Sequence, residues 1–136
     1  MPTANSIITP QTPKAWKATC TAAETAFHAP TNVQVLVDET ADATAHRITG
    51  LHAIARAAIA TACNCQLYWK VGTSYTLIDS VVLGTGTPSG SVANQKADFG
   101  YSEDNPLILP AGVGLAVAIG QAVANGVAFK AQGGGY

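Results

Sequence analysis

Charged residues are scarce in this chain, and this scarcity is the first constraint on its function. Asp, Glu, Lys and Arg make up 11% of the 136 residues, against roughly 25% in a typical soluble domain. Such a surface has few of the groups that keep monomers apart. The apolar fraction is 48%, but much of it is alanine, whose single methyl group buries little area. We therefore expect part of the stabilising burial to occur between copies of the chain.

Other absences exclude whole classes of partner. The formal net charge is −1, and the seven basic residues are scattered along the sequence. A nucleic acid held by its phosphates is therefore not expected. No apolar run approaches the roughly 18 residues of a membrane-spanning helix. The first residues lack the charged start and apolar stretch of a signal peptide, so we expect synthesis in a cytoplasm.

Residue patterns for catalysis or metal binding are also missing. The three histidines stand at no supporting distance from the three cysteines, and no glycine pattern marks a nucleophilic serine. A structural zinc site needs four ligands at characteristic spacing. The sequence thus predicts no enzyme, no cofactor and no metal.

The cysteines leave two alternatives open. In an extended segment, Cys63 and Cys65 share one face with their Cα atoms about 6.6 Å apart, which places them poorly for a disulfide with each other. Cys20, Cys63 and Cys65 are then either buried thiols or candidates for a disulfide between subunits.

Two regions of different composition suggest the domain organisation. Residues 1–14 contain three prolines among Thr, Ser, Asn and Gln, and proline lacks the backbone donor that a central strand requires. We expect an extended N-terminal arm over 1–14 and one folded domain over 15–136.

Period-two alternation of apolar side chains predicts strands through most of that domain. The expected strands lie near residues 16–20, 33–37, 65–70, 75–83, 96–101, 107–109, 113–119 and 123–131. Residues 48–62 fit either a helix or a long strand, and we favour the strand. A tight turn at 110–112 is expected to join the strands 107–109 and 113–119, the second presenting a Gly and Ala face opposite its aliphatic row. About eight or nine strands indicate an all-β sandwich, in the form of a jelly roll.

Aromatic residues are candidates for contacts between subunits. On an extended segment Tyr68 and Trp69 face opposite ways, and we expect Leu67 and Trp69 to face the core and Tyr68 to face outward. Trp16, Tyr68 and Tyr136 are the candidate interface aromatics.

Four segments resemble small virion structural proteins of tailed bacteriophages. They are residues 47–54 (RITGLHAI), the hairpin from 65–68 to 75–80, residues 98–102 (DFGYS) followed by 105–107, and residues 118–120 followed by 127–134. The resemblance covers about residues 45–136, and it rests on the residue patterns of the strands and on the positions of the turns.

This resemblance implies a β-sandwich that decorates or cements a phage capsid, commonly as a trimer. The expected partners are then a homotrimer and the major capsid protein, and the expected location is the capsid surface of the virion. The candidate capsid-contact residues of the arm are Pro2, Ile7, Ile8, Pro10 and Pro13. The alternatives are a tail, neck or fibre component and a carbohydrate- or receptor-binding β-sandwich module.

Overall fold

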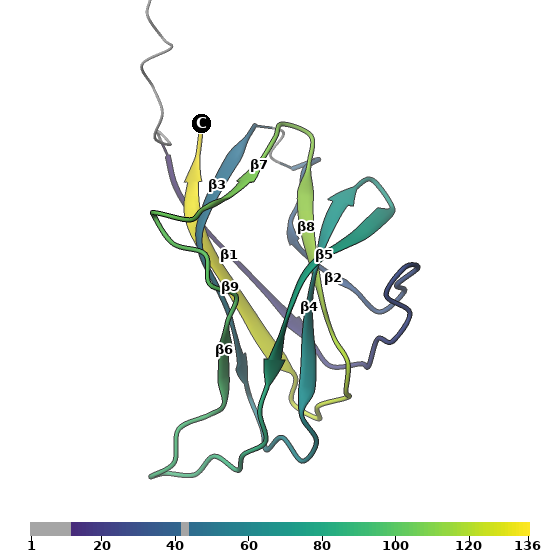
Figure 1. Cartoon of the computed structure of the whole chain (residues 1–136), viewed down its shortest axis with the longest axis vertical. Coiled ribbons are helices and arrows are strands. Elements are labelled where there is room, and N and C mark those ends of the chain that lie inside the picture. Colours follow the sequence, from purple (N-terminus) through teal and green to yellow (C-terminus); the bar gives the residue numbers. More distant parts are fainter. Residues whose placement is uncertain (1–11, 42–43) are drawn as a thin grey trace, which may run out of the picture.

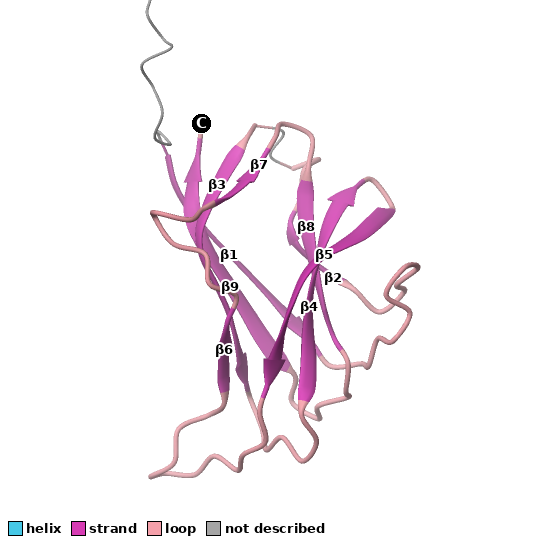
Figure 2. Ribbon diagram, in the orientation of Figure 1, coloured by secondary structure: helices cyan, strands magenta, loops and turns pink. Residues whose placement is uncertain are grey.

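Two antiparallel sheets face each other in the computed structural model, which describes residues 12–41 and 44–136 (Figures 1 and 2). The described residues form nine strands and no helix. The first sheet has the order β1-β9-β3-β6, and β7 also pairs with β3. Its strands are β1 (Thr12–Cys20), β9 (Val127–Gly135), β3 (His46–Ala55), β6 (Lys96–Asp98) and β7 (Leu107–Leu109).

The second sheet has the order β2-β8-β4-β5. Its strands are β2 (Gln34–Val37), β8 (Gly114–Ile119), β4 (Cys63–Val71) and β5 (Ser74–Leu83). The expected all-β sandwich is therefore confirmed.

The strand pairs are nested along the chain. β1 pairs with β9, β2 with β8, β3 with β6 and β7, and β4 with β5, all antiparallel. Each sheet consequently contains strands from both the first and the second half of the sequence. The jelly-roll form stays a prediction, and this nesting agrees with it.

The core consists of the inward rows of both sheets. Successive side chains of a strand point to opposite faces, and the inward members are almost wholly buried. They include Ile48, Leu51, Ala53, Val127, Phe129 and Ala131 from the first sheet, and Cys65, Leu67, Leu115, Val117 and Ile119 from the second. Trp69 packs against this cluster as well, so the expected inward direction of Leu67 and Trp69 is confirmed.

The strands 107–109 and 113–119 are joined by the expected turn, but they do not pair with each other. β7 pairs with β3 in the first sheet, whereas β8 pairs with β2 and β4 in the second. The turn between them is real: the Val113 amide donates to the Pro110 carbonyl at 3.2 Å, and Gly112 has φ of 84°, as the third position of a type II turn requires. This turn passes the chain from one sheet to the other. The sequence marks a reversal of direction but does not specify the pairing partner.

Residues 48–62 form a strand only in part. β3 ends at Ala55, and the irregular segment beyond it is fixed where Ile59 and Gly86 exchange two backbone hydrogen bonds of 2.8 and 3.1 Å. The helical alternative is excluded, since β3 pairs with β9 along its length. The last strand starts at Val127 instead of residue 123, because a turn with Gly126 at φ of 85° precedes it.

The sheet begins earlier than the expected domain boundary at residue 15. β1 starts at Thr12 and pairs with Gly135. Pro13 is tolerated because β1 is an edge strand, whose outer side needs no ladder hydrogen bond. Pro2, Ile7, Ile8 and Pro10 of the expected arm lie outside the described residues.

Gly133 provides a test of how tightly the first sheet is packed. A Cβ atom at this position would lie 1.8 Å from the Arg47 carbonyl oxygen of β3. Gly133→Ala should therefore lower the free energy of unfolding by about 3 kcal/mol through overpacking, measured by urea denaturation.

Gly90→Ala is the matched control, since a Cβ there meets nothing within 4 Å, and its stability should stay within about 0.5 kcal/mol of wild type. Equal urea midpoints for the two variants would show that the β3–β9 contact is looser than described.

Candidate functional site

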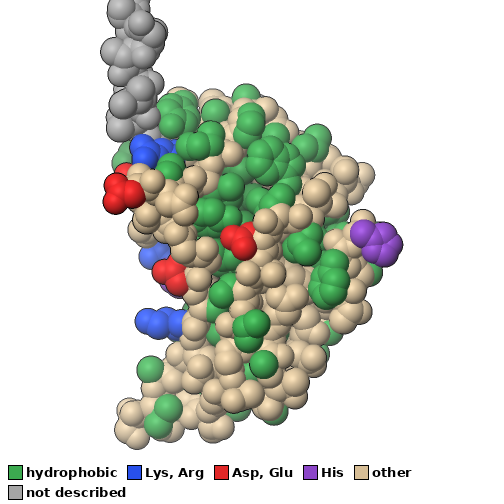
Figure 3. All heavy atoms as spheres, in the orientation of Figure 1, with side chains coloured by type: hydrophobic (Ala, Val, Ile, Leu, Met, Phe, Trp, Pro, Cys, Tyr) green, Lys and Arg blue, Asp and Glu red, His purple; other side chains and the backbone are tan. Residues whose placement is uncertain are grey.

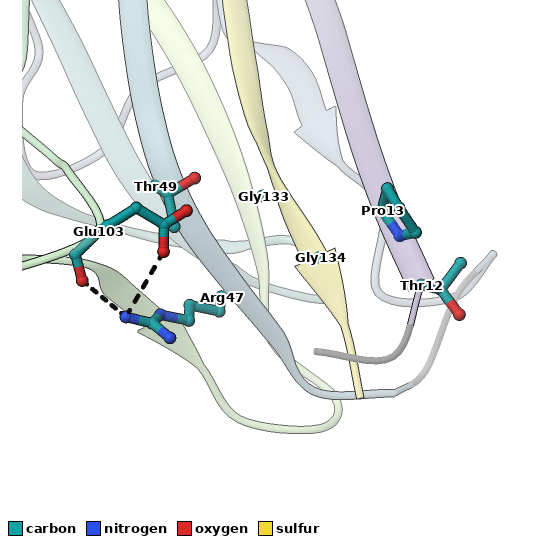
Figure 4. Close-up of a pocket in the computed structure, with 7 residues that line it drawn as sticks. All are labelled: Thr12, Pro13, Arg47, Thr49, Glu103, Gly133 and Gly134. Carbon is teal, nitrogen blue, oxygen red and sulfur yellow. Dashed lines mark hydrogen bonds and ion pairs between the residues drawn. The ribbon is translucent and has the colours of Figure 1, made fainter. Parts of the chain in front are cut away.

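Shallow hollows lie on the outer face of the sheet β1-β9-β3-β6. One, of about 260 Å³, is drawn in Figure 4. Its lining residues come from three strands and one loop, and they are Thr12, Pro13, Arg47, Thr49, Glu103, Gly133 and Gly134. Two glycines form much of its floor, which leaves few side chains for chemistry.

The guanidinium group of Arg47 in this hollow interacts with another residue of the same chain, Glu103. Arg47 Nη2 donates to the Glu103 carbonyl oxygen at 2.6 Å, and the Glu103 carboxylate lies 4.0 Å away. Figure 4 shows the guanidinium turned toward Glu103 and away from Thr12 and Pro13. Arg47 thus ties the loop before β7 to the sheet.

A row of ionisable side chains crosses the same face. Lys17 of β1 lies opposite Lys130 of β9, Lys130 lies opposite His52 of β3, and His52 lies opposite Asp98 of β6. We call these four residues the lysine row. A hollow of about 470 Å³ lies over Lys17, Lys130 and His52. The other residues that line it are apolar, and they are Ala15, Trp16, Ile54, Ala128 and Phe129.

The fold gathers cations that the sequence scatters. Lys96 lines a further hollow of about 360 Å³ beside His52 and Asp98, and Arg47 lies farther along β3. In Figure 3 the Lys and Arg side chains are seen along the left side, where Figure 1 places this sheet, with Asp and Glu side chains among them, while most of the front is hydrophobic or polar. The pattern in the sequence does not reveal this face, because its members come from β1, β3, β6 and β9.

Glu24 is a buried carboxylate that organises the connection between β1 and β2. It accepts backbone hydrogen bonds from Ala26 at 3.0 Å, Thr31 at 2.6 Å and Asn32 at 2.7 Å. The Asn32 amide is the largest cause that holds the pKa of Glu24 below its usual value. The Glu24 carbonyl also accepts a hydrogen bond from Gln66 of β4 at 2.9 Å, so the connection is fastened to the outer face of the second sheet.

A second buried carboxylate joins two other loops. Glu39 Oε1 lies 2.6 Å from Lys70 Nζ, and Glu39 Oε2 accepts the Gly72 amide at 2.7 Å. The hydrogen bond from Lys70 is the main cause that lowers the pKa of Glu39. Both carboxylates are occupied by structural partners. Sequence reasoning missed them because an isolated Glu in a loop looks like any exposed acid.

The three cysteines are buried free thiols. Their exposed fractions are 1% or less, and Cys20 Sγ donates to the Val117 carbonyl at 3.4 Å. Burial raises the pKa of Cys20 to about 12, and a hydrogen bond with Cys63 together with burial raises the pKa of Cys65. Of the two alternatives, the structure has the buried thiols, since a bond to another subunit would first require the core to open.

The three candidate interface aromatics have different surroundings. Trp16 is half-buried and packs edge-on against His46, with ring centroids 5.3 Å apart. Tyr136 is 41% exposed. Tyr68 does lie on the outer face of β4, but the expectation that it contacts a partner is wrong. It is fully buried with Ala116 and Ala118, and its hydroxyl donates to Gln66 Oε1, because residues of the β1–β2 connection cover this face.

Comparisons with models of known families, with curated proteins and with solved structures gave no match. Among residues 12–41 and 44–136, no three His, Cys, Asp or Glu side chains are grouped so that they can hold a metal ion. The same residues contain no helix that is long and apolar enough to cross a membrane.

Thiol labelling tests the burial of the cysteines. With an alkylating reagent, the native protein should incorporate less than about one-tenth of the label that it takes up in denaturant, because all three sulfurs are buried and the raised pKa of Cys20 and Cys65 keeps those two thiols protonated. Intact mass spectrometry gives the stoichiometry. Rapid labelling of the native protein, or a reduction-sensitive dimer band on a gel, would contradict the buried-thiol structure.

Glu24 should make stability fall in acid. Its folded pKa is lowered, so its contribution is complete above the usual carboxyl pKa near 4.3 and is lost as pH falls through the lower folded value. Glu24→Gln should cost about 1–3 kcal/mol at pH 7 and should flatten the acid limb of a plot of Tm against pH. Glu103→Gln is the control, since that side chain is 81% exposed. Identical acid limbs for wild type and Glu24→Gln would contradict the assigned role.

Proposed function

We propose that this chain is a non-enzymatic structural protein of a phage virion, which assembles as a homotrimer and decorates the outside of the capsid. The observation that carries the proposal is the unprotected edge strand β5. Natural sheets protect their edges with proline, lysine or short strands, because an open edge is a template for pairing with another chain.

Three of the four sheet edges have such protection. β1 carries Pro13, Lys14 and Lys17, β2 has 4 residues, and β6 has 3 residues and includes Lys96. β5 is different. It is 10 residues long, contains no Lys, Arg or Pro, and pairs only with β4 among the described residues.

The surface around β5 is also apolar. Val71, Leu77, Ile78 and Val82 are 49%, 37%, 38% and 65% exposed. The one acid of the strand, Asp79, accepts a hydrogen bond from Tyr101 at 2.8 Å. Burying a large aliphatic side chain contributes about 1.5–3 kcal/mol, so this surface is suited to contact between subunits.

A contact from β5 to a different surface of the next subunit generates a ring when the rotation closes. The proposed ring is a trimer, as the resemblance of the sequence to phage decoration proteins implies. Its subunits would bridge neighbouring capsid proteins and oppose the outward pressure of packaged DNA, with the expected arm residues Pro2, Ile7, Ile8, Pro10 and Pro13 contacting the capsid. The major capsid protein is then the external partner.

Light scattering of the isolated protein tests self-association. Wild type should have three times the protomer mass of 13.8 kDa, about 41 kDa. Val82→Lys should shift the protein to the protomer mass, because it places a charge in the apolar contact. Val92→Lys is the matched control, since Val92 is 50% exposed in the loop between β5 and β6 and does not belong to the edge strand.

Binding to phage heads stripped of decoration tests the location. Wild type should bind the heads, and negative-stain images of labelled particles should show it on the head. Label on the tail would favour a tail, neck or fibre component, and specific signals on a glycan array would favour a carbohydrate-binding module. A stable monomer without affinity for heads would refute the proposal.

A further inference from the structure

We infer that the outer face of the sheet β1-β9-β3-β6 docks a carboxylate-rich protein surface through Lys17 and Lys130. The inference rests on the proposed function where it names the capsid as that surface, and it specifies which face of the subunit meets the capsid.

The first argument is an unfavourable pair of charges. Lys17 and Lys130 are directly opposed in the β1–β9 register, where Cβ atoms are about 4.5–5.5 Å apart and like charges destabilise a sheet. Within the described part of the chain, the recorded ion pairs involve Arg47 and Lys70 but neither of these lysines. Stability alone would not favour this pair, so a role in binding explains it better.

The second argument is the position of the one acid in the lysine row. Asp98 occupies the far end of the lysine row, two strands away from Lys130, which is roughly 10 Å at the usual strand spacing. His52 lies between them. Among residues 12–41 and 44–136, no carboxylate forms an ion pair with either of the two ammonium groups, and a partner's carboxylate can do so.

The third argument is charge complementarity over the whole face. The face carries Lys17, Lys130, Lys96 and Arg47 against Asp98 and Glu103, whereas the complete chain has a net charge of −1. The positive character is thus local. It attracts an acidic surface and orients it toward this sheet.

The surroundings of the lysines favour a protein over a nucleic acid. The hollow of about 470 Å³ beside them borders on Ala15, Ile54 and Ala128, so it accepts small apolar groups together with carboxylates. Binding of single-stranded nucleic acid uses exposed aromatic rings on which bases stack. Trp16 of β1 lines this hollow, but its ring is half-buried and packs edge-on against the buried His46.

The binding experiment uses the full chain and immobilised poly-L-glutamate as the carboxylate probe, with duplex DNA as the phosphate probe. At about 50 mM NaCl, wild type should bind poly-L-glutamate, and it should dissociate near 500 mM as screening increases. Lys17→Gln combined with Lys130→Gln should weaken binding about tenfold. Thr85→Glu combined with Thr87→Glu makes the same change in net charge at two exposed loop positions and should bind as wild type does.

A second readout separates binding from a structural role. Either single variant, Lys17→Gln or Lys130→Gln, should raise the Tm of the free protein by about 2 °C at low salt, because it removes the repulsion. The gain should diminish at high salt. A lower Tm for both single variants would show that the lysines serve the fold, and it would overturn the inference.

The outcomes with phage heads separate this inference from the proposed function. If wild type binds poly-L-glutamate through the lysines but not heads, the face is confirmed and the capsid role fails. If heads bind wild type and the double lysine variant equally, the capsid role stands and this inference fails. The inference also fails if wild type does not bind poly-L-glutamate, or if the Thr85→Glu, Thr87→Glu control loses as much binding as the double lysine variant. It fails as well if wild type binds duplex DNA more tightly than poly-L-glutamate.

Discussion

The pairing of β9 with both β1 and β3 is the interaction on which the rest of the structure depends. β9 brings the end of the described chain between its first strand and the centre of the first sheet. Its inward side supplies Phe129 to the core, and its outward side places Lys130 between Lys17 and His52. The close approach of Gly133 to the Arg47 carbonyl limits this strand to residues without a side chain at that point. The same strand, β9, therefore contributes side chains to both the hydrophobic core and the charged outer face.

The two sheets present different outer faces, and this difference gives the molecule two separate surfaces. Much of the second sheet is covered by the chain itself, through the connection that Glu24 organises and beneath which Tyr68 is buried. The apolar edge around β5 remains open there. The outer face of the first sheet is open and carries the lysine row. An apolar edge suits contact between copies, and a positive face suits contact with an acidic partner, so the two do not compete.

Sequence patterns predicted the elements that depend on neighbouring residues. The alternation of apolar and polar side chains located the buried rows of β4 and β8. The turn of the expected hairpin between β4 and β5 contains Gly72, with φ of 61°. The same patterns failed where a distant partner decides. β7 and β8 join opposite sheets although one short turn connects them, and Tyr68 is buried although alternation correctly places it on the outer face. In both cases the deciding contacts come from segments that are remote in sequence.

The sequence by itself determined that this protein is an all-β sandwich with a thinly charged surface, because strand periodicity and composition are local or global properties that need no pairing. Only the tertiary structure decided which side chains meet. Lys17 and Lys130 belong to opposite ends of the chain, and their opposition exists only in the register of β1 and β9. A shift of one residue would send one lysine into the core. Registers are set by the simultaneous burial of all inward rows, which no single segment encodes.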